Sequence, residues 1–188
     1  MANVTVFHHA LGLTAGIEAF ANALAAGGHD VSTPDLFDGA TFTSIEAGVA
    51  HAETLGFEKI AEAGAKAVTG DRVVVIGFSL GVLPAQKVAQ QRPGVVAAVL
   101  CHSAAPLGFF GDTWPSGVAL QTHAGARDPF VEEDREAIDQ LLEAASVSQA
   151  HWYDTEAHLF ADATSADFDA TLAGQLATRT LEFLSDHT

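Results

Sequence analysis

Ser79 lies in a short segment whose composition and flanks are typical of a nucleophile. Residues 77–81 read Gly-Phe-Ser-Leu-Gly, after an apolar run at residues 72–76 and before a helix-compatible stretch at residues 82–91. A strand, a sharp turn with serine at its apex and a helix together form a nucleophile elbow, which presents the hydroxyl above the end of a sheet. Small residues on either side of the serine leave room for the strained turn. The pattern predicts a nucleophilic hydroxyl at Ser79; the alternative is an ordinary turn in which Ser79 caps the helix.

Backbone amides near Ser79 could stabilise the negative charge that forms on a carbonyl oxygen under attack. The amide of Leu80 would lie at the start of the following helix, where the helix dipole favours an anion. A second amide is expected from the loop at residues 8–12, His-His-Ala-Leu-Gly, which leaves the first strand at the same edge of the sheet. Ala10 is the first choice for this donor, and Leu11 is the second.

A serine hydroxyl needs a base to take its proton and a carboxylate to orient that base. The chain has nine histidines, and their positions relative to the strands separate them. Asp128 follows an apolar strand at residues 118–123, and His158 follows a strand at residues 150–153. Because the carboxyl ends of parallel strands meet at one edge of a sheet, Ser79, Asp128 and His158 are predicted to form a catalytic triad. The alternatives are a turn residue before a proline for Asp128 and a surface histidine for His158.

Strands and helices alternate along the chain. Predicted strands occupy residues 3–7, 29–33, 72–76, 95–101, 118–123 and 150–153. Predicted helices occupy residues 17–26, 82–91, 132–145 and 168–184, and residues 44–68 form one or two more. This order indicates an α/β fold, a mostly parallel sheet of about six strands with helices on both faces. No repeat, low-complexity tract or linker interrupts it, so a single domain over residues 1–188 is predicted.

One long connection, residues 103–117, has no regular pattern and is rich in aromatic side chains. Aromatic residues in such a loop either cover the edge of the sheet or line a pocket. The segment is short for a helical lid, which favours an open site for a small substrate. The residues predicted to line the substrate pocket are His9, Leu11, Phe109, Phe110 and Trp114.

Composition and charge exclude several classes of partner. The chain carries 24 acidic and 8 basic residues, a net charge of −16. Binding to nucleic acid needs a basic surface, and anionic membranes repel an acidic one, so neither partner is expected. With one cysteine there can be no internal disulfide. The first residues lack the features of a signal peptide and no apolar stretch is long enough to span a membrane, which predicts a cytoplasmic protein. Nothing in the sequence indicates an oligomeric state.

The adjacent histidines His8 and His9 raise the possibility of a metal site. Together with His102 they could supply three ligands. However, neighbouring residues of a strand point to opposite sides, and no cysteine or carboxylate follows with the spacing of a zinc site. We therefore predict no metal and no cofactor. His123 and His151 are expected to pack in or beside the core, and Cys101 is expected to be a buried apolar residue. His102, at the end of a strand, could approach the site, but a structural role is expected for it.

The chain resembles the dienelactone hydrolase family of α/β-hydrolases along nearly its whole length. The segments that carry the resemblance are residues 4–12, 33–37, 77–81 and 125–130, with Tyr153, His158 and Phe160. The resemblance implies a compact α/β-hydrolase fold, with Ser79 as nucleophile, Asp128 as acid and His158 as base.

Two departures from the family pattern bear on the substrate. Members that act on dienelactone typically have cysteine as nucleophile, and a glutamate in the first loop that interacts with it. Here the nucleophile is Ser79, and residues 8–12 contain no acid. Serine depends more on its base than cysteine does, so we expect a small carboxylic ester as substrate rather than dienelactone itself. The alternatives are an acyltransferase or thioesterase with the same triad, and a non-catalytic domain that binds a small ligand.

Overall fold

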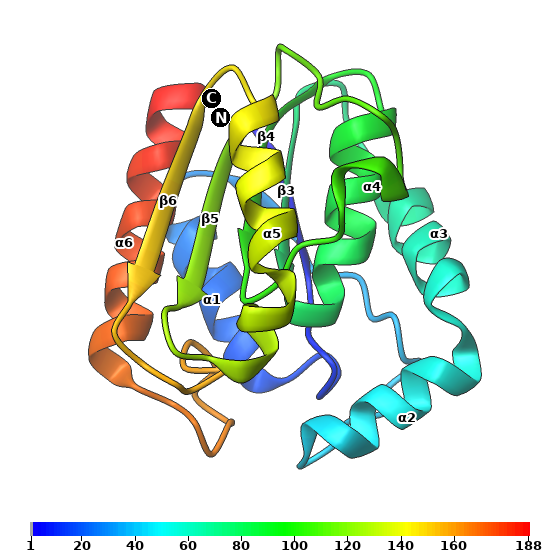
Figure 1. The fold of residues 1–188 in the computed structure, drawn as a ribbon, viewed down its shortest axis with the longest axis vertical. Coiled ribbons are helices and arrows are strands. Elements are labelled where there is room, and N and C mark those ends of the chain that lie inside the picture. The colour runs from blue at the N-terminus through cyan, green and yellow to red at the C-terminus, as the bar shows by residue number, and fades with distance from the viewer. Residues whose placement is uncertain (1) are drawn as a thin grey trace.

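A six-stranded, all-parallel sheet forms the centre of the molecule (Figure 1). The structure is a computed structural model and describes residues 2–188; Met1, part of the segment considered for a signal peptide, lies outside them. The strands are β1 (Asn3–Phe7), β2 (Asp30–Ser32), β3 (Val73–Phe78), β4 (Val95–Cys101), β5 (Ala119–Gly125) and β6 (Ser148–Tyr153), in the spatial order β2-β1-β3-β4-β5-β6. The helices are α1 (Ala15–Ala26), α2 (Ile45–Leu55), α3 (Phe57–Ala67), α4 (Val82–Gln91), α5 (Pro129–Ala144) and α6 (Ala170–His187). The predicted fold class is confirmed.

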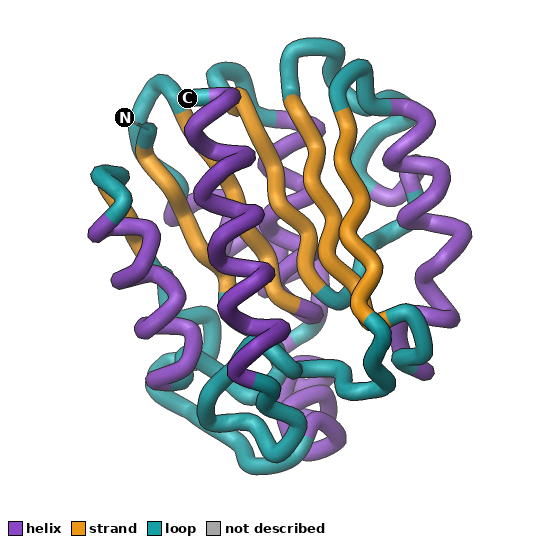
Figure 2. The backbone as a smooth tube through the Cα atoms, turned by 90° about the vertical axis from the view of Figure 1, so that its left-hand side faces the viewer, coloured by secondary structure: helices purple, strands orange, loops and turns teal. Residues whose placement is uncertain are grey.

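Helices cover both faces of the sheet, as a parallel sheet requires (Figures 1 and 2). The six residues of β3 are all buried, and successive side chains point to opposite faces. Val73 and Val75 pack in a core with residues of α4 and α5. Val74 and Ile76 pack in a second core with residues of α1 and α6. The continuous apolar run of β3 therefore serves two cores at once, and the strand is held rigidly from both sides.

Local signals explain where the helices begin and end. The helical pattern predicted for residues 44–68 is two helices, because Gly56 between them has a φ of 92°, a conformation that favours glycine. The helix predicted from residue 132 begins earlier, at Pro129, because Asp128 caps it by accepting a hydrogen bond from the Phe130 amide. The connection at residues 103–117 contains one short 3-10 turn, Leu107–Phe109.

The strands all run toward the same edge, which is the lower one in Figure 1, while both chain termini lie at the opposite edge. The loops that follow the strands are therefore gathered at one end of the molecule. Within residues 2–188, no helix has both the length and the apolar character needed to cross a membrane.

Candidate active site

Ser79 sits in a strained turn between β3 and α4. Its φ is 49°, in the left-handed region that residues other than glycine seldom adopt. The flanking glycines are required by close packing. A Cβ on Gly77 would lie 2.4 Å from the carbonyl oxygen of Gly81, and a Cβ on Gly81 would lie 2.4 Å from that of Phe7. The turn thus packs directly against the end of β1, and it has the geometry of a nucleophile elbow.

Ser79, His158 and Asp128 form a continuous chain of hydrogen bonds. The Ser79 hydroxyl lies 2.8 Å from His158 Nε2, and His158 Nδ1 lies 2.6 Å from Asp128 Oδ2. His158 and Asp128 are both buried. With a proton on Nδ1 that is donated to Asp128, the imidazole can accept the serine proton at Nε2. The structure therefore brings together the three residues that the sequence analysis predicted to form a triad.

The loops that carry Asp128 and His158 hold each other in place. Asp128 lies three residues beyond β5, and His158 lies five beyond β6. The Ala126 amide donates to the carbonyl of Tyr153 at 2.7 Å, and the Arg127 amide donates to that of Thr155 at 3.1 Å. These two bonds extend the pairing of β5 with β6 past the strands. The separation of acid and base is therefore fixed by backbone contacts.

Leu80 and Ala10, whose amides were predicted to stabilise the oxyanion, lie at the same cleft as Ser79. Both residues line a cavity of about 320 Å³ next to the nucleophile. The Leu11 amide, by contrast, donates to His9 Nδ1 at 3.2 Å and is already used. A Cβ on Gly48 of α2 would lie 1.8 Å from the carbonyl oxygen of Ala10, so α2 packs against the backbone of this loop. The geometry favours Ala10 over Leu11 as the second amide.

The cleft is largely apolar, with a single charged residue on one wall. Apart from Ser79, its described lining residues with polar side chains are Ser103 and Asp134. Asp134 accepts a hydrogen bond from the Ser103 hydroxyl at 2.6 Å. Burial raises the pKa of Asp134 above its ordinary range, although the hydrogen bonds from Ser103 and the Ala104 backbone act in the opposite direction. No basic side chain lines the described part of this cleft. The complete set of lining residues is Ala10, Val49, Phe57, Ser79, Leu80, Val82, Leu83, Ser103, Ala104, Ala105, Pro106, Phe109 and Asp134.

His9 does not line the cleft, contrary to prediction. It is buried, and its Nε2 donates to Asp162 at 2.6 Å while its Nδ1 accepts from the Leu11 amide. Asp162 also accepts hydrogen bonds from Thr14 and Thr164. Burial alone would raise the pKa of Asp162, but these hydrogen bonds outweigh it and hold the pKa far below its usual range. Leu11 is also buried and outside the cleft. His9 and Asp162 instead anchor the loop that carries Ala10.

The three aromatic residues of the long connection have different roles. Phe109, which was predicted to line the substrate pocket, lies at the cleft beside Ser79. Phe110 lines an adjoining cavity instead. Trp114 is buried in the core, where its Nε1 donates to the carbonyl of Val118 at 2.9 Å. The prediction that Trp114 lines the pocket is wrong, because its side chain packs in the core that β3 forms with α4 and α5.

His102 lies beside the triad without belonging to it. Its ring centre is 5.8 Å from that of His158, and within residues 2–188 neither of its buried ring nitrogens has a hydrogen-bond partner. Burial lowers the pKa of His102 well below its ordinary value, and the nearby His158 acts in the same direction. It is therefore a neutral packing residue. His8 is also structural, since its Nδ1 donates to the His9 carbonyl and its Nε2 accepts from the Leu36 amide. In the described chain, no group of three or more metal-ligating side chains is placed to hold an ion.

Two side chains of the candidate site were not found by the sequence analysis, Asp134 in the cleft and Asp162 beside the loop that carries Ala10. Asp134 lies in a predicted amphipathic helix, where an acid is expected to face water. Asp162 contacts His9, which is 153 positions away in the chain. The residues around these two acids do not distinguish them from other acidic residues. The one available signal was that Asp134 lies in the first turns of a helix that begins at the carboxyl ends of the strands.

Comparison with known proteins gives one consistent result. The family model described as "Dienelactone hydrolase family" matches residues 1–188. A dienelactone hydrolase-like promiscuous phosphotriesterase from metagenomic libraries is similar in structure, with a TM-score of 0.81 and 23% identity over 100% of this chain and 87% of that chain. A structure named m3DLH has a TM-score of 0.75 and 25% identity over 96% of this chain and 85% of that chain. Mouse alpha/beta hydrolase domain-containing protein 10 has a TM-score of 0.66 and 11% identity over 98% of this chain and 90% of that chain. No curated protein sequence matches significantly.

Proposed function

Because the chain belongs to the dienelactone hydrolase family and is a hydrolase acting on esters, we propose that it cleaves small carboxylic esters through an acyl-enzyme on Ser79. The observation that carries this proposal is the chain of hydrogen bonds from Ser79 through His158 to Asp128, with distances of 2.8 Å and 2.6 Å. A protein that only binds a ligand has no need of a base and an acid aligned behind a hydroxyl that lines a cleft. The arrangement therefore favours a catalyst over a binding domain.

The first half of the reaction forms the acyl-enzyme. Ser79 Oγ attacks the ester carbonyl carbon while His158 Nε2 takes the hydroxyl proton. Asp128 stabilises the imidazolium that results. The carbonyl oxygen gains a negative charge and is placed near the amides of Leu80 and Ala10, which stabilise it. The bond to the alcohol oxygen then breaks, and His158 gives its proton to the departing alcohol.

The second half releases the acid. A water molecule attacks the acyl carbon and gives a proton to His158 Nε2, and the same two amides hold the oxyanion. When the bond to Ser79 breaks, His158 returns the proton to the serine oxygen. The products are an alcohol and a carboxylic acid, and the enzyme is regenerated. Every step uses groups of this chain and water alone.

The charge of the cleft points to uncharged esters. Asp134 is the only charged residue among the lining residues, and no basic side chain faces it within the described cleft. A substrate that carries its own carboxylate would meet a like charge in a partly buried setting, which is unfavourable. The proposed substrate is therefore a neutral ester, in keeping with the serine nucleophile and the first loop without an acid.

The proposal is tested with 4-nitrophenyl acetate and a fluorophosphonate probe. The wild-type protein should hydrolyse the ester and carry the probe on Ser79. Ser79→Ala should lose about 10⁴-fold to 10⁶-fold in turnover and lose the label, while its thermal unfolding is unchanged. Ser103→Ala is a matched control, because Ser103 lines the same cleft but bonds to Asp134 rather than to a histidine, and it should keep the label. Activity of Ser79→Ala within about tenfold of wild type would reject the assignment.

A second measurement tests the absence of metal chemistry. Treatment with a chelator should leave the rate unchanged, because the two amides replace a Lewis acid at the developing oxyanion. Loss of activity with the chelator and recovery with zinc would contradict the mechanism. A thioester substrate assayed alongside distinguishes a thioesterase that uses the same three residues.

A further inference from the structure

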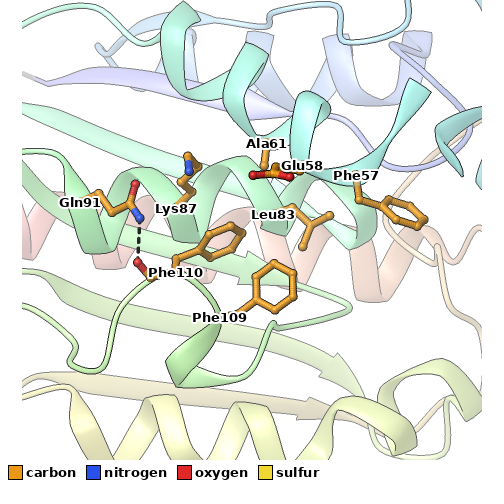
Figure 3. A pocket seen from close by; sticks show the side chains of 8 residues that line it. All are labelled: Phe57, Glu58, Ala61, Leu83, Lys87, Gln91, Phe109 and Phe110. Carbon is orange, nitrogen blue, oxygen red and sulfur yellow. Dashed lines mark hydrogen bonds between the residues drawn. The ribbon is translucent and has the colours of Figure 1, made fainter. Parts of the chain in front are cut away.

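A second cavity continues the Ser79 cleft between α3, α4 and the long connection (Figure 3). It has a volume of about 280 Å³. It shares Phe57, Leu83 and Phe109 with the cleft, so the two cavities adjoin at these three side chains. We call this second cavity the aromatic groove. Its lining residues are Phe57, Glu58, Ala61, Leu83, Lys87, Gln91, Phe109 and Phe110.

Glutamines on α4 hold the outer wall of the aromatic groove in place. Gln86 donates to the Ala105 carbonyl at 2.9 Å and accepts from its amide at 3.0 Å. Gln91 donates to the Phe110 carbonyl at 2.7 Å, the bond drawn in Figure 3. Gln90 adds bonds to three further carbonyls of the connection, those of Leu107, Gly111 and Thr113. The wall is therefore fixed by hydrogen bonds from glutamine side chains to its backbone before any ligand arrives, which reduces the entropy lost on binding.

Large apolar side chains along the aromatic groove are exposed to solvent. Phe109 is 62% exposed and Phe57 is 39% exposed, on opposite walls. Phe110 packs edge-on against Phe109, with ring centres 4.9 Å apart. Leaving such rings in water is unfavourable, and grouped exposed aromatics mark binding grooves. An apolar group placed between them would cover all three rings.

The position of His158 decides which half of the ester lies in the aromatic groove. The alcohol must leave from a place beside His158 Nε2, because that atom gives it a proton. His158 lines neither the cleft nor the aromatic groove. The part of the substrate that extends from the carbonyl carbon along Leu83 to Phe110 is therefore the acyl group.

We propose that the aromatic groove is an acyl subsite, which selects esters of uncharged arylalkanoic or medium-length alkanoic acids. This inference rests on the proposed function and goes beyond the small acyl group expected from the sequence. Each methylene group that leaves water for the aromatic groove should raise kcat/KM about fourfold, the equivalent of about 0.8 kcal/mol. Glu58 and Lys87, which carry opposite charges, also line the aromatic groove, and the Lys87 Nζ lies 5.6 Å from the centre of the Phe110 ring.

The test compares acyl and alcohol series on the intact protein. The acyl series runs from 4-nitrophenyl acetate through the butanoate and hexanoate to 3-phenylpropanoate, and the alcohol series keeps acetate and lengthens the alcohol. We expect kcat/KM for the phenylpropanoate to exceed that for acetate by at least about tenfold, the effect of burying a few methylene equivalents. The alcohol series should be nearly flat.

Phe110→Ala should lower the ratio of phenylpropanoate to acetate activity at least about fivefold, since it removes most of one wall. Phe110→Leu, which keeps an apolar side chain, should restore part of the ratio. Phe168→Ala is the matched control, because Phe168 is exposed but lines neither cavity, and it should leave the ratio unchanged. Thermal unfolding of each variant verifies that it is folded.

The possible outcomes separate this inference from the proposed function. If acetate is hydrolysed but the acyl series is flat, or if Phe110→Ala leaves the ratio unchanged, the acyl subsite is refuted and the esterase stands. If instead kcat/KM rises with the length of the alcohol, and Phe110→Ala removes that rise, the aromatic groove binds the alcohol and its assignment to the acyl group is overturned. If no ester is cleaved and the probe does not label Ser79, both proposals fail.

Discussion

Replacing Asp162 with alanine should destabilise the protein strongly, although Asp162 does not touch the cleft. Its carboxylate accepts hydrogen bonds from His9 and Thr14, whose side chains are buried. Alanine would leave these two donors without partners, at a cost of about 1–3 kcal/mol each. The expected loss is therefore about 4 kcal/mol, the middle of the range for two such donors. For a chain of this length that corresponds to a fall in Tm of about 8–16 °C.

Asp169→Ala is the matched control for this change. Asp169 is also an acid with two hydrogen bonds, to the amides of Thr171 and Leu172 at the start of α6, but it is exposed. Loss of such a helix cap costs about 1 kcal/mol, or about 2–4 °C in Tm. Thermal unfolding by circular dichroism at neutral pH compares the two variants. If Asp162→Ala melts no lower than Asp169→Ala, the reasoning about buried donors is refuted.

The pH dependence gives an independent check on Asp162. Because the pKa of this carboxyl is lower in the folded state than in the unfolded chain, its contribution to stability is fully present at neutral pH. It is lost as the pH falls below the unfolded value of about 3.9 toward the lowered folded value. The acid limb of a plot of Tm against pH should therefore be shallower in Asp162→Ala than in the wild type. Equal limbs would show that the carboxyl is not held ionised by its partners.

Asp162 also connects to catalysis through His9. The ring of His9 bridges Asp162 and the Leu11 amide, and so it orients the backbone that carries Ala10. A displaced oxyanion donor costs about 10²-fold to 10³-fold in kcat. Esterase assays on Asp162→Ala, made well below its Tm, should show a lower kcat with a smaller change in KM. An unchanged kcat would separate this anchor from the oxyanion site.

Three further predictions concern the turn, the cleft and the cysteine. Gly81→Ala should lower the free energy of unfolding by about 3 kcal/mol or more, because its Cβ would lie 2.4 Å from the Phe7 carbonyl oxygen. Thermal unfolding measures this loss. The control is Gly174→Ala, where a Cβ would meet nothing within 4 Å, and this variant should not be destabilised. Asp134→Asn should raise kcat/KM for a carboxylate-bearing ester relative to a neutral one at least about fivefold, and an unchanged ratio in paired assays would contradict the role given to its charge. The Cys101 thiol, whose pKa is raised by burial, should not react with Ellman's reagent until the protein is unfolded; rapid reaction of the folded protein would show that β4 is open to solvent.

Much of the candidate site could be predicted because its signals are local. The turn around Ser79 needs a strand, two glycines and a helix within about twenty residues of chain, and each has a recognisable pattern. Asp128 and His158 could be assigned because each follows a strand, and parallel strands bring their carboxyl ends together. Asp128 both caps α5 and bonds to His158. The sequence analysis recognised only its bond to His158, and it therefore did not predict that α5 begins at Pro129.

The remaining features depend on contacts between distant parts of the chain. Phe109 and Trp114 are five positions apart in one irregular loop, yet one is exposed beside Ser79 and the other is buried. Their different positions follow from the bonds between the loop and glutamines of α4, which have no sequence signature. His9 was assigned to the pocket because of its neighbours in sequence, whereas its partner Asp162 comes from the opposite end of the chain. Side-chain direction in loops is set by such partners rather than by local composition.

The contact between α2 and the Ala10 loop makes the active site depend on the opening of one small helix. Only Gly48 and Ala52 of α2 are buried, and Ala52 belongs to a minor apolar cluster with Phe37 and Ile60, separate from the two main cores. Segments with so little buried surface open locally at a fraction of the free energy of global unfolding. Each opening would remove Val49 from the cleft and the backbone support of Ala10. Amide hydrogens of α2 should therefore exchange well before those of β3 and β4, and this local equilibrium sets the fraction of molecules that hold a complete oxyanion site at any moment.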